Sequence, residues 1–431
     1  MEFHDVLHGH IRFNAIDPST PLLQDLIGSP EINRLRNMRQ MNFDVPLIQE
    51  LGRARRLPHS IGVTYMALQL AQRHGLSISD TKVLVAAAML HDAAIPPYGH
   101  LVEDEFKNAG FEFRHEKRVA QLIKGTVNAQ NKYLAILPGK SLQVSEILDK
   151  YNVDPDKVIG AIRPTGMRTA ISADIDLDNI DNVHRMAIML GWNNARENTD
   201  RIMNGAILHS IGPMTYHERA VPSLENWLDF RQRIYTLIIA HPECIPYNAL
   251  QVDLVRLAVS EHIISPDEWW LSEPEFEDAM RRNEATKGLA MQLIAGCDYQ
   301  LVDYAWLKHF DAYGKANNAE ITNWMLSNIN IPAGYGYFVW NERKLISRQV
   351  QVTDDTGRSR GIGENSTSCM IALIKKTIGR PKWTKAQSFE WRQQVVTHFA
   401  RLFDVHDFEV DFPETYTGNF RGRNSELNFG Y

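Results

Sequence analysis

Hydrophobic residues recur at helical spacing over most of the chain from about residue 20 to about residue 307, which is typical of helices that bury one face. The segment DTKVLVAAAMLH, residues 80–91, predicts a strongly apolar helix with Ser79 as its N-cap. Another helix is predicted through SIGVTYMALQLAQRHG, with Pro58 in its first turn and Gly75 at its C-terminal end. This part of the chain is therefore predicted to be a helical body.

Two later segments continue the helical pattern. Residues 230–240, FRQRIYTLIIA, predict an amphipathic or buried helix. Residues 178–190, DNIDNVHRMAIML, predict another, because one face would carry Ile180, Val183, Met186, Ala187 and Leu190.

The pattern changes near residue 331. The stretch GYGYFVWNERKLISRQVQVTDD, residues 334–355, predicts two strands joined by a short polar turn. Beyond it we predict helices at about 368–376 and 386–403, a strand at 408–412, and a loosely ordered Gly- and Asn-rich tail at 415–431. The predicted fold class is therefore mainly α, with a helical domain over residues 1–330 and a smaller α+β region over residues 331–431.

Composition adds little to the predicted fold class, but it indicates the cellular compartment. The 431 residues are 44% hydrophobic and 23% charged, an ordinary globular mixture. Cys244, Cys297 and Cys369 lie far apart without metal-like spacing, so we expect reduced core thiols. Residues 1–11 lack the apolar stretch of a signal peptide, and no window approaches the roughly 18 apolar residues of a spanning helix. We expect a cytoplasmic protein with no membrane partner.

The charges are unevenly distributed. The net charge of −6 argues against a protein that coats nucleic acid through bulk charge. One short stretch nevertheless holds six arginines, which suggests a local anion site; the alternative is a solvated helix face followed by a basic loop. These arginines are Arg34, Arg36, Arg39, Arg53, Arg55 and Arg56.

A candidate metal site is formed by His59, the pair His91-Asp92, and the carboxylate-rich segment 174–181. Imidazoles and carboxylates together suit a divalent transition metal such as Mn, Fe, Co, Ni or Zn and do not decide among them; Mg is an additional candidate. Such a metal polarises a phosphoryl oxygen and lowers the pKa of bound water, as phosphoester hydrolysis requires. A His-Asp dipeptide alone is weak evidence, but here it ends an apolar helix.

Around these residues the sequence resembles the HD-domain deoxynucleoside triphosphate triphosphohydrolases, both the dGTPase group and the sterile-alpha-motif/HD group. The resemblance covers about two-thirds of the chain, with its motifs in the family's order. It implies that the helical core is an HD domain. The motifs are HDVLHGHIRF, EINRLRNMRQM, RRLPHSIGVTYMA, MLHDAAIPPYGHLVEDEF, RHEKRV, IDLDNIDNVHRMAIMLG and, more weakly, FRQRIYTLIIAHPE.

The resemblance implies a role for each matching residue. The metal ligands would be His59, His91, Asp92 and Asp178. The catalytic set would be His100, with His115 in support and Glu103 as their acidic partner. Arg56 and Arg231 would contact phosphates, and Gln40 the sugar. The implied reaction is attack by a metal-activated water on the α-phosphorus, releasing nucleoside and tripolyphosphate.

Several positions depart from the family pattern. Ile95 stands where a second histidine usually follows the His-Asp pair. Asn179 and Asn182 replace a phosphate-contacting lysine and a tyrosine, while Met186 and Ile239 replace an aspartate and an aromatic residue of the sugar pocket. A pocket that cannot pair a hydroxyl loses the discrimination that such pairing provides. These changes leave the reaction centre complete and the sugar preference open.

Three hypotheses follow. The first is a phosphohydrolase of dNTPs or related nucleotides, and the family resemblance favours a homo-oligomer. The second is an HD-type phosphodiesterase or nuclease, which the acidic net charge does not favour, since such a protein would need a basic groove with stacking aromatics. The third is a non-catalytic oligomeric binding protein, against which the full set of ligands and histidines argues. The region after residue 331 has no motif with evident chemistry and fits an interface or a lid.

Overall fold

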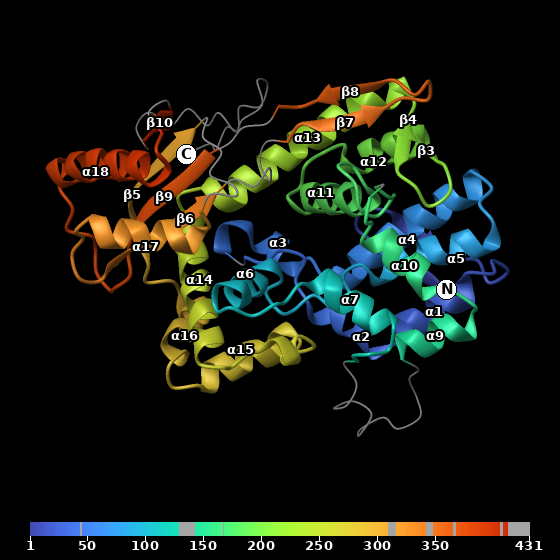
Figure 1. The fold of residues 1–431 in the computed structure, drawn as a ribbon, viewed down its shortest axis with the longest axis horizontal. Coiled ribbons are helices and arrows are strands. Elements are labelled where there is room, and N and C mark those ends of the chain that lie inside the picture. Colours follow the sequence, from blue (N-terminus) through green and yellow to red (C-terminus); the bar gives the residue numbers. More distant parts are fainter. Residues whose placement is uncertain are drawn as a thin grey trace.

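The computed structural model describes residues 1–43, 45–128, 143–166, 168–308, 316–341, 348–364, 368–405 and 408–412. Over this part of the chain the fold is mainly α, which confirms the predicted fold class. Figure 1 shows a helical body on one side and, on the other, strands accompanied by the helices α17 and α18.

A two-stranded antiparallel hairpin, β1 (Glu2–Asp5) and β2 (Gly9–Arg12), opens the chain. Short helical segments lead from it toward the centre of the body. They are α1 (Thr20–Gly28), α2 (Pro30–Asn33), η1 (Arg34–Asn37), η2 (Pro46–Ile48) and α3 (Gln49–Arg53).

Helices α4 (Arg56–Arg73) and α5 (Ile78–Leu90) pack together, and both agree with the prediction. The N-cap of α5 was predicted two residues too late: the side chain of Ser77, not Ser79, accepts a hydrogen bond from the backbone N–H of Asp80. Ser77 has the extended backbone that an N-cap needs, whereas Ser79 already lies inside the helix. Because α5 is buried almost all round, it presents His91 at its end from a rigid support.

The other helices surround this pair. Helix α11 agrees with the prediction for residues 178–190, whereas residues 230–240 form the end of α13 followed by the π-helical turn η4. These elements are α6 (His100–Asn108), α7 (His115–Ile123), α9 (Val144–Lys150), α10 (Pro155–Ile162), α11 (Leu177–Met189), α12 (Ala195–Gly205), η3 (Glu218–Ala220), α13 (Val221–Tyr235), η4 (Thr236–Ala240), α14 (Cys244–Ser260), η5 (Pro266–Glu268), α15 (Glu273–Arg282) and α16 (Lys287–Ala295).

An antiparallel sheet with strand order β10-β5-β9-β6 forms the wall opposite the helical body. On one face, Leu307 and Ile371 share a core with Trp391 of helix α18. On the other face, Trp306 and Met370 belong to the core of the helical body. The elements of this region are β5 (Gln300–Lys308), α17 (Asn318–Asn328), β6 (Tyr335–Asn341), β9 (Ser368–Lys375), α18 (Lys385–Phe403) and β10 (Glu409–Asp411).

Two predictions for this region were wrong. Residues 368–376 were predicted as a helix but form strand β9, and β5 lies within the stretch that was predicted to be mostly helical. The predicted strands of 334–355 exist as β6 and β7 (Val350–Thr353), but β7 pairs with β8 (Ser359–Ile362) in a separate hairpin.

The remaining predictions for the C-terminal region divide as follows. Helix α18 and strand β10 confirm the elements predicted near 386–403 and 408–412. The tail at 415–431 lies outside the described residues, and the domain division at residue 330 stays a prediction. A further small hairpin joins β3 (Ala206–Leu208) to β4 (Met214–Tyr216).

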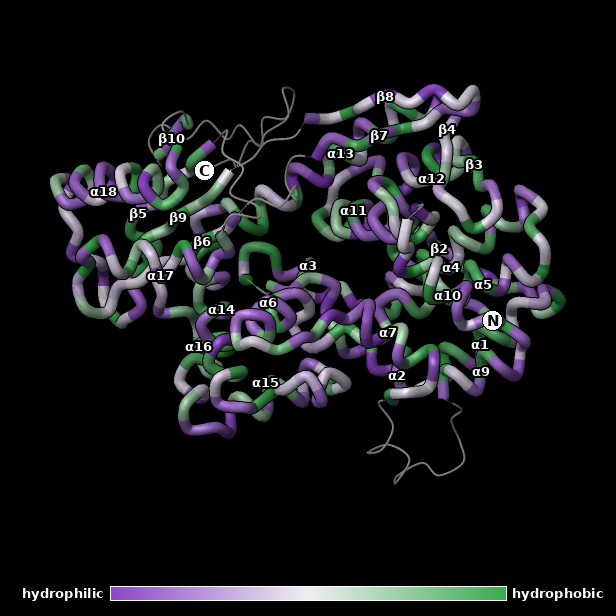
Figure 2. Tube along the Cα trace, viewed as in Figure 1, coloured by the Kyte–Doolittle hydropathy of each residue, from purple (hydrophilic) through white to green (hydrophobic). Residues whose placement is uncertain are grey.

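Hydrophobic and hydrophilic stretches alternate along the trace (Figure 2). Among the described helices, none has the length and hydropathy that crossing a bilayer would require.

Candidate metal centre and active-site cleft

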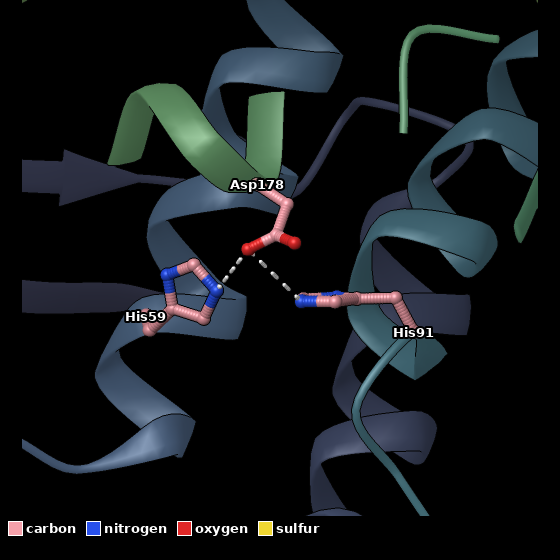
Figure 3. A group of neighbouring side chains, drawn as sticks. All are labelled: His59, His91 and Asp178. Carbon is pink, nitrogen blue, oxygen red and sulfur yellow. Dashed lines mark hydrogen bonds and ion pairs between the residues drawn. The ribbon is translucent and has the colours of Figure 1, made fainter. Parts of the chain in front are cut away.

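Three side chains from three helices meet at one point. His59 comes from the first turn of α4, His91 follows the last residue of α5, and Asp178 lies in the first turn of α11. His59 Nε2 is 3.0 Å and His91 Nε2 is 3.7 Å from the same Asp178 oxygen, Oδ1. Figure 3 shows both imidazole rings directed at that carboxylate. One donor atom from each residue lies within 4.8 Å of the other two, so the three could hold one ion.

The bonding of His91 tests whether the site fits a metal. Its Nδ1 forms a 2.8 Å hydrogen bond with the backbone carbonyl of Ala88, so Nδ1 must carry the proton. In the neutral ring Nε2 then presents a lone pair, and this buried atom has no hydrogen-bond partner among the residues that the structure describes. A buried acceptor without a partner is costly unless a ligand satisfies it. The donor set therefore fits a divalent transition metal.

Asp92 lies at the edge of this cluster. Its Oδ2 is 3.7 Å from His91 Nε2 and accepts a 2.5 Å hydrogen bond from Arg56. Burial opposes its ionisation, but the Arg56 guanidinium and nearby histidines hold the pKa of Asp92 far below its usual range. Asp92 is therefore an anion beside the imidazoles, and its role as fourth ligand stays a prediction.

His100, Glu103 and His115 form a second cluster. Glu103 Oε2 lies 2.6 Å from His100 Nδ1, and Glu103 Oε1 lies 3.0 Å from His115 Nδ1. Burial opposes ionisation of Glu103, but the two histidines lower its pKa. The ionised carboxylate therefore accepts a hydrogen bond from the Nδ1–H group of each histidine. The side chain of His100 is 64% exposed while that of His115 is buried, so His100 is the histidine that a substrate can reach.

The turn before α6 positions His100. Tyr98 and Gly99 both have positive φ angles, of 60° and 52°. Tyr98 is buried and its hydroxyl lies 3.2 Å from Glu277, which anchors the turn. A side chain at Gly99 would meet Asn42 Oδ1 at 2.3 Å and would be strained at the positive φ, so this position favours glycine.

A cleft of about 640 Å³ joins the two clusters. His59 and Glu103 lie behind its surface. The other predicted site residues line it: Gln40, Arg56, His91, Asp92, His100, His115, Asp178 and Arg231.

The predicted substrate contacts have distinct surroundings. Arg231 is buried, lies over the ring of Tyr235, and donates to Asn179 Oδ1 at 3.3 Å. Gln40 is buried as well, and within the described ranges its Oε1 has no hydrogen-bond partner. Arg56 projects from the N-terminus of α4. These placements bring the three residues to one cleft, and their roles toward a substrate stay predictions.

Sequence reasoning missed the far wall of the cleft. Residues of α17 and β6, including Asn318, Trp340 and Asn341, line it opposite the helical body. No motif could have indicated them, because they reach the cleft only through the packing of the sheet. Sequence reasoning also missed the contact of Asp181 with His59, whose Nδ1 lies 2.8 Å from Asp181 Oδ1. The carboxylate-rich segment 174–181 was the only signal for it.

Comparison with known proteins gives a family for part of the chain. The HD domain model matches residues 56–186, which include both histidine clusters and Asp178. The residues outside this match contribute Gln40, Arg231 and the far wall of the cleft.

Two curated relatives illustrate the similarity, and both are described as uncharacterized proteins. The chain is 28% identical over 255 residues to the uncharacterized protein MG461 of Mycoplasma genitalium, covering 55% of each chain. It is 24% identical over 245 residues to the uncharacterized protein YwfO of Bacillus subtilis, covering 56% of this chain and 52% of the relative. The chain thus spans about half the length of the curated relatives it matches. Residues 56–186, in the N-terminal half of the chain, are thus an HD domain.

Proposed function

We propose that this protein is a metal-dependent phosphohydrolase of nucleoside triphosphates that releases nucleoside and tripolyphosphate. The observation that carries this proposal is one cleft, lined by three of the four proposed metal ligands (His91, Asp92 and Asp178), by the exposed His100 and by the cations Arg56 and Arg231. Binding alone would not need a histidine pair beside a metal site. The proposal includes a homo-oligomeric state, which a mass measurement in solution would test against the 49.3 kDa of one chain.

The metal held by His59, His91, Asp178 and Asp92 would supply charge that polarises the phosphate and activates a water. Arg56 and Arg231 would hold the phosphates, since guanidinium groups offer several donors in a fixed plane. The water oxygen bonds to the α-phosphorus as the bond to the sugar oxygen breaks. His100 would donate a proton to that leaving oxygen, and Glu103 keeps its ring oriented.

The test is turnover by purified, Mn-loaded protein given separate dNTPs, rNTPs and single-stranded DNA, with products separated by chromatography. A His91→Ala/Asp92→Ala variant is the control. We expect nucleoside plus tripolyphosphate, absent with the variant. Shortened DNA beside intact nucleotides would instead favour the nuclease hypothesis, and no turnover of any substrate would contradict both.

A further inference from the structure

The turn of the N-terminal hairpin reaches toward the metal centre. Asp5, at the end of β1, accepts backbone hydrogen bonds from Leu7 and His8, both at 2.9 Å, which fixes the turn. Arg185 of α11 holds the same carboxylate at 2.7 Å. Arg196 of α12 donates to the turn carbonyl of Leu7 at 2.8 Å. The turn is therefore tied to two helices and presents His8 in one position.

His8 contacts the metal site through Asp181. Both oxygens of this fully buried carboxylate are occupied: Oδ2 lies 2.7 Å from His8 Nε2, and Oδ1 lies 2.8 Å from His59 Nδ1. Arg185 donates to Oδ1 at 2.7 Å and to Oδ2 at 3.0 Å. Each oxygen thus accepts two hydrogen bonds in a nearly saturated arrangement.

This arrangement fixes which nitrogen of His59 faces the metal site. An ionised carboxylate only accepts hydrogen bonds, so His59 Nδ1–H donates to Asp181, and Nε2 is turned toward Asp178. A carboxylate behind a ligating histidine also fixes the orientation of the ring and raises its basicity.

The space for the network is reserved on α4. A side chain at Gly62, one turn after His59, would meet Asp181 Oδ2 at 2.2 Å and His8 Nε2 at 2.9 Å. Glycine at this helical position costs stability relative to alanine. The close approach of Asp181 and His8 explains why glycine is present at position 62 despite this cost.

We propose that His8 is a positioning residue of the metal centre, which holds Asp181, and through it His59, in the geometry that binds the metal. A segment outside the HD domain match at residues 56–186 then sets the metal affinity of that domain. The inference rests on the metal site of the proposed function and not on any substrate.

The test is a titration of metal-free, full-length protein with Co²⁺, followed by the visible absorption of the bound ion. His8→Met removes the hydrogen bond and keeps much of the volume, and we expect Co²⁺ binding to weaken by about 10- to 100-fold. His8→Gln keeps a donor that can reach Asp181 and should restore most of the affinity. The matched control is His10→Ala, because His10 lies on the same hairpin but is half-exposed and stacks on His4.

Metal-free thermal unfolding of each variant separates positioning from folding. A lower melting temperature with unchanged Co²⁺ affinity in His8→Met would overturn the proposal, since His8 would then only hold the fold together. Equal loss of affinity in His8→Met and His8→Gln would also overturn it. If wild-type protein bound no Co²⁺, the metal centre itself would be refuted, whereas a failure to hydrolyse nucleotides would leave this titration untouched.

Discussion

Arg56 and Asp92 meet in the wall of the cleft with both side chains nearly buried. The sequence suggested separate roles for them, one at the phosphate and one at the metal, and their contact means that neither charge is independent. Arg56 neutralises Asp92 before any ligand arrives. The site therefore keeps an anion beside two imidazoles without leaving it unpaired.

Removing Arg56 should consequently destabilise the fold. In Arg56→Ala the buried charge of Asp92 loses its partner, and we expect the free energy of unfolding of the metal-free protein to fall by about 3 kcal/mol in urea denaturation. The double variant Arg56→Ala/Asp92→Asn should recover part of this loss. Equal stability of wild type and Arg56→Ala would contradict the prediction, because it would mean that water pairs with the Asp92 carboxylate as well as the guanidinium does.

The Glu103–His115 pair should make stability depend on pH. Burial alone would lower the pKa of His115, but the Glu103 carboxylate raises it to about 8, above the ordinary 6.5. Its contribution to stability is therefore complete below about pH 6.5 and is lost as pH rises through about 8. The lowered pKa of Glu103 adds a contribution that is complete above about pH 4.5 and is lost in stronger acid.

The corresponding measurement is the urea-unfolding free energy of wild type and Glu103→Gln between pH 5 and pH 9. We expect the difference to be largest near pH 5 to 6.5 and to shrink by pH 9, as His115 loses its proton in the wild type. A difference that does not change over this range would mean that the pair is not charged in the fold.

At the scale of the residue, the sequence indicated the side chains that meet in the candidate metal cluster better than the side chains that support them. His59, His91 and Asp178 could be named because motifs carry them. His8 could not be assigned its partner, since its bond to Asp181 joins residues 173 positions apart and depends on how a hairpin packs on α11.

At the scale of the element, helices with one polar face were predicted correctly and strand β9 was not. A strand on a solvated sheet alternates apolar and polar residues, but β9 is buried on both faces and reads SCMIALIK. A continuous apolar run cannot be distinguished from a buried helix by its period. Because α18 packs on one face and the helical body on the other, β9 lacks the alternation of apolar and polar residues that would have indicated a strand.

The turn before α6 offers an element-scale prediction. Gly99→Ala should displace His100, because its Cβ would meet Asn42, and should lower kcat by about 10- to 100-fold if His100 is the proton donor. The matched control is Gly75→Ala at the end of α4, which also has a positive φ, of 62°, but open space around it. The control should lose about 1 kcal/mol of stability and keep its activity. Unchanged turnover in Gly99→Ala would show that catalysis does not depend on the conformation of this turn.

At the scale of the whole molecule, the cleft lies between the HD domain and a wall that the sequence did not predict. The mainly α class and an α+β C-terminal region were predictable from periodicity. The contribution of α17 and β6 to the cleft was not, because it arises from how the sheet sits on the helical body.

Filling the far wall should affect substrate and spare the metal. Thr322 of α17 lines the cleft, and Thr322→Trp should lower kcat/KM for nucleotides by about tenfold or more, equivalent to about 1.4 kcal/mol of lost binding. Asn323→Trp, at the exposed neighbouring position, is the control and should be neutral. Unchanged Co²⁺ affinity in both variants would place the effect on the substrate. Wild-type kinetics in Thr322→Trp would exclude this wall from binding.

The origin of that wall outside residues 56–186 has an evolutionary consequence. Mutations in α17 and β6 can reshape one wall of the cleft without touching any histidine or aspartate of the proposed metal set. Under the proposed function, a lineage can thus change the leaving groups that it accepts while the metal set stays the same. Exchanging this region between homologues is then a direct route to a different substrate preference.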